Sequence, residues 1–185
     1  VASNQQSHYT DVQFYDLFSP TDVMNLWRRV NTWWYAYSAY CSTSNFRAPL
    51  HQAPLLQQFL TTAEHAVEAG KPQATLRFGH EVCVMPLVCL LNLNHYGDPV
   101  DDLEDLDDRG WNNYQIFPMA CNVQFIFYKP KKQAPNADNV LVKVLLNEDE
   151  ATLPVGTDQA PYYHWKDVRS YYMKQLDDYQ AHYVK

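Results

Sequence analysis

The sequence predicts an α/β protein whose front portion is all helical. In the first 70 residues, apolar side chains recur at helical spacing. Beyond that point, short apolar runs bounded by turn residues alternate with further helical patterns. The 185 residues are enough to bury a core. We therefore assign residues 1–72 to a helical part and residues 73–185 to a part in which strands and helices mix.

Two helices are predicted in the front part. Ser19-Pro20-Thr21-Asp22 combines a capping serine, a proline at the first helical position and an acid three residues after the cap. Apolar residues at helical spacing then continue to Tyr37. A second helix is predicted to begin near Pro54 and to stop at Gly70, and the stretch from Asn45 to Gln52 between the two helices reads as a loop.

The spacing of the apolar residues changes after the second helix. Ala74–Phe78 is predicted to be a short buried strand. Gly79 and His80 then turn the chain into a third helix, from Glu81 to about Leu91, that contains a proline.

The remaining elements are an acid-rich loop and a strand pair followed by a helix. Residues 94–108 are predicted to be a loop or a short helix. Asn122–Tyr128 and Val140–Leu146 read as strands joined by a polar connector. A last helix is predicted from about Trp165 to Tyr183 and should pack back on the sheet.

Charge and hydropathy exclude several classes of partner. The formal net charge of −7 argues against a general affinity for nucleic acid or an anionic membrane. No apolar run approaches the roughly 18–20 residues that span a bilayer. The N-terminus shows no basic-then-apolar export signal.

Metal binding is not expected. The four cysteines form no C-x-x-C pair, which disfavours zinc, whereas the sequence leaves disulfides open. The acids of residues 98–108 lack the alternating ligands and terminal glutamate of an EF-hand, so we interpret them as a solvated loop.

Leu76-Arg77-Phe78-Gly79-His80-Glu81 is the stretch that best fits a chemical role. A histidine that follows a strand and a glycine, at the start of a helix, lies where unpaired N–H groups and the helix dipole favour anions. The adjacent carboxyl group, Glu81, could donate a proton to a leaving oxygen. The competing interpretation is that His80 caps the helix and that the negative charge of Glu81 interacts favourably with the helix dipole.

This stretch also carries a family resemblance. LRFGHEVCVMPLVCLL, residues 76–91, resembles the second signature of the histidine acid phosphatases, particularly their multiple inositol polyphosphate phosphatase branch. Pro118-Met119-Ala120-Cys121-Asn122 resembles the family's P-x-A-x-N stretch. Residues 142–148, followed by Leu153-Pro154, resemble its LLNE…LP strand.

The resemblance implies a fold and an activity. The chain would be the C-terminal part of a histidine-phosphatase-type α/β sheet domain, with residues 1–72 as part of a helical lobe on the substrate side. The intact enzyme would hydrolyse phosphomonoesters, inositol polyphosphates among them, through a phosphohistidine and without a metal or other cofactor. By the same resemblance, it would be periplasmic or extracellular.

The resemblance also implies residue roles. His80 would bind the phosphoryl oxygens and Glu81 would protonate the leaving group. Arg77 would contact phosphate, or would form a structural ion pair. In His80-Glu81-Val82 the acid directly follows the histidine, as it does in the family's H-D motif. In the H-A-E motif of the inositol polyphosphate branch the acid is one residue later, where this sequence has Val82.

The family's first motif, R-H-G-x-R-x-P, has no match, because Arg-His-Gly occurs nowhere in the sequence. The nucleophilic histidine would therefore belong to a missing N-terminal part of the same protein, and the isolated chain would be inactive. An incomplete sheet exposes an edge, so we expect the chain to recruit that part or a second copy.

A non-enzymatic fragment is the alternative. It would bind sugars or a protein partner through aromatic side chains near the end of the first helix. These are Trp33, Trp34, Tyr35, Tyr37 and Tyr40, although helical spacing predicts that most of them lie in the core.

Overall fold

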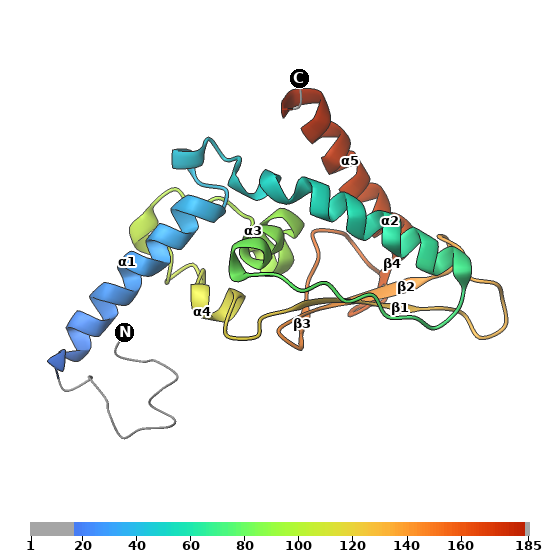
Figure 1. Cartoon of the computed structure of the whole chain (residues 1–185), viewed down its shortest axis with the longest axis horizontal. Coiled ribbons are helices and arrows are strands. Elements are labelled where there is room, and N and C mark those ends of the chain that lie inside the picture. Colours follow the sequence, from blue (N-terminus) through green and yellow to red (C-terminus); the bar gives the residue numbers. More distant parts are fainter. Residues whose placement is uncertain (1–16, 184–185) are drawn as a thin grey trace.

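The computed structural model describes residues 17–183, and the first 16 residues of the predicted helical part lie outside them. Helices and a four-stranded sheet are mixed along the chain, as predicted (Figure 1). The helices are α1 (Pro20–Ser38), α2 (Ala53–Ala69), α3 (Glu81–Leu91), the single turn α4 (Asn113–Ile116) and α5 (Trp165–Tyr183). The strands are β1 (Val123–Tyr128), β2 (Leu141–Leu146), β3 (Asp149–Ala151) and β4 (Tyr163–His164).

Helix α1 begins with the predicted cap. The Ser19 hydroxyl accepts a hydrogen bond from the Asp22 N–H at 3.2 Å, and the Asp22 carboxylate accepts one from the Ser19 N–H at 3.1 Å. Hydrogen bonding to Ser19 lowers the pKa of the Asp22 carboxyl. The buried Asn31 then ties the helix to the chain around α4, because its amide donates to the Trp111 carbonyl at 2.8 Å.

Helix α2 begins and ends where its sequence predicts. Gly70 follows its last residue with φ +60°, the left-handed conformation that ends many helices. The predicted loop from Asn45 to Gln52 contains one short 3-10 turn, Ala48–Gln52, and a second turn, Ser42–Ser44, precedes it.

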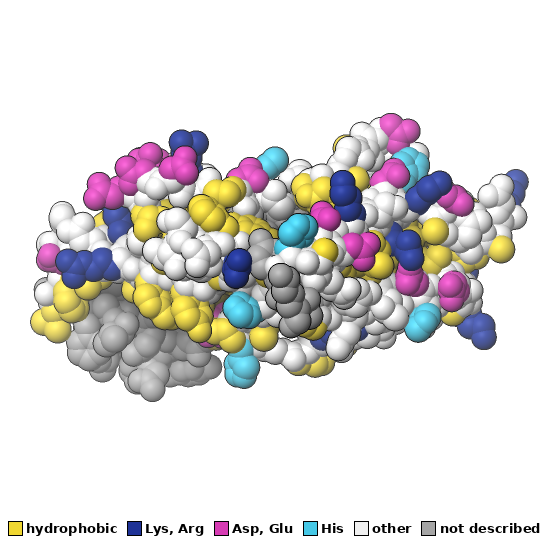
Figure 2. All heavy atoms as spheres, turned by 90° about the horizontal axis from the view of Figure 1, so that it is seen from above, with side chains coloured by type: hydrophobic (Ala, Val, Ile, Leu, Met, Phe, Trp, Pro, Cys, Tyr) yellow, Lys and Arg dark blue, Asp and Glu magenta, His cyan; other side chains and the backbone are white. Residues whose placement is uncertain are grey.

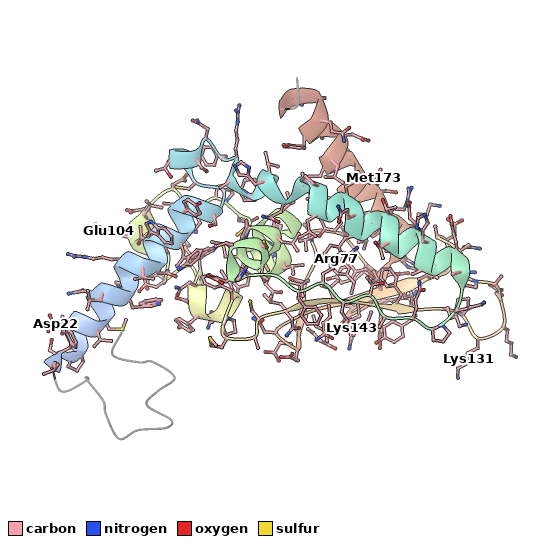
Figure 3. All side chains as sticks on the ribbon, viewed as in Figure 1. Asp22, Arg77, Glu104, Lys131, Lys143 and Met173 are labelled. Atoms are coloured by element: carbon pink, nitrogen blue, oxygen red, sulfur yellow. The ribbon has the colours of Figure 1, made fainter. Side chains whose placement is uncertain are left out.

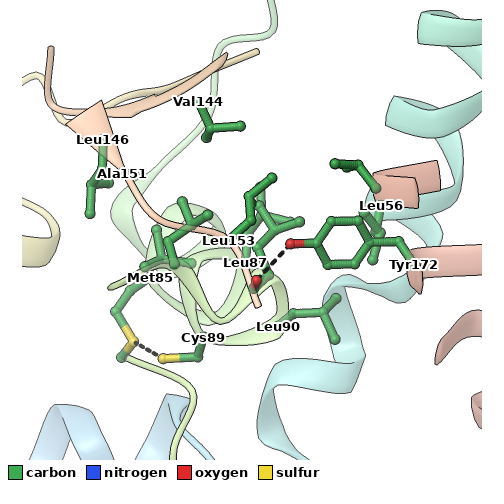
Figure 4. Close-up of a cluster of buried hydrophobic side chains, with 14 of the residues drawn as sticks. Leu56, Met85, Leu87, Cys89, Leu90, Val144, Leu146, Ala151, Leu153 and Tyr172 are labelled. Atoms are coloured by element: carbon green, nitrogen blue, oxygen red, sulfur yellow. Dashed lines mark hydrogen bonds between the residues drawn. The ribbon is translucent and has the colours of Figure 1, made fainter. Parts of the chain in front are cut away.

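Helix α3 lies at the centre of the molecule. Every residue from Met85 to Leu91 is buried, so this helix is enclosed on all sides over its second half. Pro86 lies inside it, as predicted, and leaves the Val82 carbonyl without the usual intrahelical donor. Figure 4 shows side chains from the sheet and from α2 and α5 packed around α3.

The sheet is antiparallel throughout. β2 lies at its centre and pairs with β1, β3 and β4. Val142, Val144 and Leu146 alternate with less buried residues along β2, so one face of this strand is buried in the core. Both predicted strands are confirmed to within a residue, whereas the short β3 and β4 were not predicted.

Helices α2 and α5 cover one face of the sheet (Figure 1). Phe59 of α2 packs against Phe125 of β1, and Trp165 of α5 packs edge-on against Phe127 of the same strand. The predicted packing of the last helix on the sheet is therefore confirmed, and the described residues form a two-layer arrangement.

The prediction of a buried strand at Ala74–Phe78 is wrong. Residues 71–80 are all exposed, residues 72–80 form no regular secondary structure, and the Leu76 and Phe78 side chains are 75% and 92% exposed. The stretch is an unpaired connection between α2 and α3, because it forms no ladder with a described strand.

One hydrophobic core joins the two predicted parts of the chain. It includes Tyr35 and Leu56 from before residue 72, and Val144 and Tyr172 from after it. The division at residue 72 stays a prediction. Among the described residues, no helix is long and apolar enough to cross a membrane.

The buried Tyr172 gives a stability test of this core. Its hydroxyl donates a hydrogen bond to the Leu91 carbonyl at 2.7 Å, at the C-terminal end of α3 (Figure 4). Tyr172→Phe leaves that carbonyl without its donor, so we expect the free energy of unfolding to fall by about 1–2 kcal/mol in urea titrations. Tyr171→Phe is the control, because Tyr171 is 41% exposed, and should change stability little. Equal losses in both variants would contradict this role for the hydrogen bond.

Candidate functional site

His80 occupies the residue just before α3. Its backbone is extended, with φ −109° and ψ 164°, and its carbonyl accepts hydrogen bonds from the N–H groups of Cys83 and Val84 at 2.9 and 3.3 Å. The His80 side chain makes no capping hydrogen bond. His80 therefore caps the helix through its backbone carbonyl, and its imidazole makes no capping hydrogen bond.

Glu81 is the first residue of α3. The side chains of His80 and Glu81 are exposed, and neither forms a hydrogen bond or ion pair with a described residue. The backbone N–H groups of Glu81 and Val82 also lack a described acceptor. The helix thus offers two free donors and its positive end beside an imidazole and a carboxyl group, which is an arrangement that suits an anion.

Arg77 is held on α2. Its guanidinium donates to the Thr62 hydroxyl at 2.7 Å and lies 4.8 Å from the centre of the Phe59 ring. Figure 3 shows Arg77 next to α2. It makes no ion pair with a described residue, so the structural ion pair that was its alternative role is absent there. The predicted contact of Arg77 with phosphate stays a prediction.

Cys121 is near Glu81, although the two are far apart in the sequence. Burial raises the pKa of the Cys121 thiol, and the negative charge of Glu81 raises it further. The stretch that resembles P-x-A-x-N therefore passes close to the start of α3.

The two later stretches of the resemblance contact one another. The Asn122 amide donates to the Glu148 carboxylate at 2.8 Å, and the Asn147 side-chain oxygen accepts from the Asn122 N–H at 3.0 Å. Asn147 and Glu148 form the two-residue turn between β2 and β3, with φ of 52° and 69°. Asn147 also donates to the carbonyls of Gln115 and Ile116, so its amide fastens α4 to this turn.

A surface pocket of about 400 Å³ lies beside this turn. It is lined by Asn94, Tyr96, Gln115, Pro118, Leu146, Asn147 and Asp149. The oxygen of Asn94 already accepts from the Thr152 N–H at 2.8 Å, and Asn147 is bonded as described above. The amides of this pocket hold the fold together, and His80 and Glu81 do not line it.

No group of three or more histidine, cysteine or acidic side chains that could hold a metal ion is present between residues 17 and 182. All four cysteines are free thiols. The apolar run that contains Cys83 and Cys89 predicts that both are core thiols. Cys89 belongs to the core, and burial raises the pKa of its thiol to about 12, whereas Cys83 is only partly buried.

No known protein-family model matches this chain. The interpretation of the site therefore rests on the motif residues and on their geometry. Sequence reasoning had named Cys121 and Asn122 only as members of a motif. Their proximity to Glu81 and Glu148 is a long-range feature that no local pattern signals.

The Glu81–Cys121 proximity can be tested by alkylation. Glu81→Gln removes a negative charge that disfavours the Cys121 thiolate, so the pKa of Cys121 should fall and its reaction with iodoacetamide at about pH 8 should become faster. Peptide mapping by mass spectrometry gives the rate for Cys121 separately from Cys83. Glu104→Gln, in the acid-rich loop, is the matched control. Unchanged Cys121 rates in Glu81→Gln would show that the carboxylate does not reach this thiol.

Proposed function

We propose that this chain supplies the second-histidine half of a histidine acid phosphatase, which hydrolyses phosphomonoesters through a phosphohistidine. The observation that carries the proposal is the setting of Gly79-His80-Glu81 at the start of α3, inside a stretch that resembles the family's second signature. The neighbouring position of the P-x-A-x-N-like stretch supports it. Inositol polyphosphates are the proposed substrates.

His80 would bind the transferred phosphoryl group together with the backbone of α3. Phosphoryl transfer depends on positive groups and N–H donors placed around the equatorial oxygens of phosphorus. The free N–H groups of Glu81 and Val82 and the His80 imidazole are such donors. Arg77 would have to leave Thr62 to join them, and this is a rotation of an exposed side chain.

Glu81 would protonate the leaving oxygen. Its carboxyl group is exposed and is not held by an ion pair with a described residue, so it is free to meet a substrate. A departing alkoxide needs a proton far more than a departing phenolate does, and general acid catalysis typically contributes 10²–10⁴-fold. The proposed mechanism uses no metal or other cofactor.

The nucleophilic histidine must come from polypeptide outside these 185 residues, since the sequence contains no Arg-His-Gly. We propose that it belongs to the same protein and that the intact enzyme acts in the periplasm or outside the cell. A complete translation product without Arg-His-Gly would eliminate the enzymatic proposal.

Leaving-group dependence tests Glu81 in the complete translation product. For Glu81→Gln, we expect hydrolysis of glycerol phosphate to fall by about 10²-fold or more, and hydrolysis of p-nitrophenyl phosphate to fall much less. Glu104→Gln is the control and should keep both rates. An equal loss for both substrates, or no loss for glycerol phosphate, would remove Glu81 as the proton donor.

The aromatic surface of α1 favours a second candidate function, the binding of sugars. Trp33 and Tyr37 are 55% and 64% exposed, and their rings stack with centroids 5.3 Å apart and planes 5° apart. The prediction that most of this aromatic group lies in the core is wrong, because only Tyr35 is buried, while Trp34 and Tyr40 are partly buried. Apolar side chains reach the surface at the α1 end of the molecule (Figure 2).

Fluorescence titration tests sugar binding independently of the proposed phosphatase activity. If α1 binds sugars, cellohexaose should change the tryptophan emission of the chain in a saturable way, and Trp33→Ala should abolish the change. Leu26→Ala is the control, because Leu26 is also exposed on α1 but offers no ring. The same titration curve in the parent chain and in Trp33→Ala would reject the stacked pair as a sugar platform.

A further inference from the structure

Three separate segments of the chain meet at the surface pocket of about 400 Å³ beside the β2–β3 turn. Asn94 and Tyr96 come from the stretch after α3, Gln115 comes from α4, and Asp149 comes from β3 (Figure 1). The proposed phosphatase reaction uses none of these side chains. Small-molecule sites are usually clefts of roughly 300–1,000 Å³ in which a few polar groups converge. The size and the polar lining of this pocket are those of such a site.

Hydrogen bonds hold the walls of the pocket in place. The Asn94 N–H donates to the Thr152 carbonyl at 3.1 Å, and the Asn94 side-chain oxygen accepts from the Thr152 N–H at 2.8 Å. The Asn147 amide donates to the carbonyls of Gln115 and Ile116 at 2.9 and 3.2 Å. These bonds join all three segments. The pocket is therefore formed before a ligand enters, and binding orders little of the chain.

Asp149 is the only charged residue among the described residues that line the pocket. It lies opposite Leu146 in the β2–β3 ladder, so both side chains are on the face of the sheet where Leu146 is buried. Its carboxylate forms no hydrogen bond or ion pair with a described residue. Glu150, the next residue, lies on the opposite face and pairs with Lys143 at 3.1 Å. The unpaired carboxylate of Asp149 favours a cation in the pocket and disfavours an anion.

Three neutral side chains of the pocket also have free hydrogen-bonding groups. The Asn94 oxygen accepts from Thr152, whereas the Asn94 NH₂ group has no acceptor among the described residues. The Gln115 oxygen accepts from the Asn112 amide at 3.3 Å, and its NH₂ group has no described acceptor either. The Tyr96 hydroxyl forms no hydrogen bond with a described residue. Burial raises the pKa of this hydroxyl, so it stays protonated and can both donate and accept.

This combination of groups disfavours several classes of small molecule. An anion would meet the Asp149 carboxylate without any cationic partner. A simple alkylammonium ion would leave both free amides without an acceptor, and a neutral sugar would leave the carboxylate without a counter-charge. A hydroxylated ring that carries an ammonium group satisfies all of them. The C–H surface of such a ring also matches the apolar walls that Pro118 and Leu146 provide.

We propose that this pocket binds an amino sugar, whose ammonium group donates to the Asp149 carboxylate. The sugar hydroxyls accept from the free NH₂ groups of Asn94 and Gln115 and exchange a hydrogen bond with the Tyr96 hydroxyl. A charge-assisted hydrogen bond is about twice as strong as a neutral one, so Asp149 determines which sugar is preferred. This inference is independent of the proposed phosphatase activity, because His80 and Glu81 do not line the pocket.

Titration of the 185-residue chain, followed by ligand-observed NMR, tests the sugar preference. At about pH 6, glucosamine carries its ammonium group. We expect glucosamine to bind saturably and at least about 10-fold more tightly than glucose or N-acetylglucosamine, which keep the ring and lack the charge. No saturable binding of glucosamine, or equal affinity for the three sugars, would overturn the proposal.

Charge-removing variants locate the ammonium group. Asp149→Asn keeps the size of the side chain, and its affinity for glucosamine should fall at least about 10-fold, to that of the parent chain for glucose. Glu150→Gln is the matched control, because it makes the same change of charge one residue away on the opposite face, and it should keep the parent affinity. Unchanged affinity in Asp149→Asn, or equal weakening in both variants, would overturn the proposal.

Tyr96→Phe tests the hydroxyl contact and keeps the ring in place. We expect it to weaken glucosamine and glucose by similar factors of about 3- to 10-fold, because both sugars offer hydroxyls. Tyr114→Phe is the control, since Tyr114 is 57% exposed on α4 and does not line the pocket. Unchanged unfolding temperatures verify that the variants fold. Parent affinity for both sugars in Tyr96→Phe would overturn the proposed contacts.

Two further titrations identify the place and the source of the sugar. Trp33→Ala should keep the parent affinity for glucosamine, and loss of binding in this variant would overturn the proposal by moving the sugar to α1. A glucosamine trimer is titrated beside the monomer, because a chain end and a free sugar share the same ammonium chemistry. Tighter binding of the trimer supports the proposal with an oligosaccharide as ligand, and equal binding supports it with the free sugar. Failure of both to bind would overturn it.

Discussion

The burial of helix α3 is the constraint on which the rest of this structure depends. Its residues from Met85 to Leu91 are enclosed on every side, by the sheet, by α2 and α5, and by the chain after α1. Burying an apolar side chain of this size contributes about 1.5–3 kcal/mol, so the orientation of α3 is fixed by many such contributions. The first turn emerges from this core, and it carries His80 and Glu81 to the surface.

Local sequence signals were reliable wherever the interaction itself is local. The Ser19–Asp22 capping box, the Gly70 stop and the helical period of α5 each involve residues within a few positions of one another, and all were predicted. The predicted strand Ala74–Phe78 failed because a strand is completed by a neighbour and not by its own residues. Its composition is typical of a strand, but the stretch forms no ladder with a described strand.

The candidate site was predictable in part for the same reason. The Gly-His-Glu sequence at a helix start is a local pattern, and His80 and Glu81 lie where that pattern predicts. The contact of Asn122 with Glu148 and the approach of Cys121 to Glu81 join residues that are distant in the sequence. The turn at Asn147-Glu148 was missed because a glutamate at φ 69° is rare, although the asparagine before it is typical of such turns.

The connection before α3 determines how firmly the backbone of His80 is held. Among the described residues, the backbone of His80 is held from one side only, by its place at the start of α3, because residues 72–79 before it form no backbone–backbone hydrogen bond. Catalytic groups work when they are held within about 0.5 Å of their productive positions, and a free connection does not hold a side chain that closely. Pairing of this connection would fix the backbone of Gly79 and His80 from the second side.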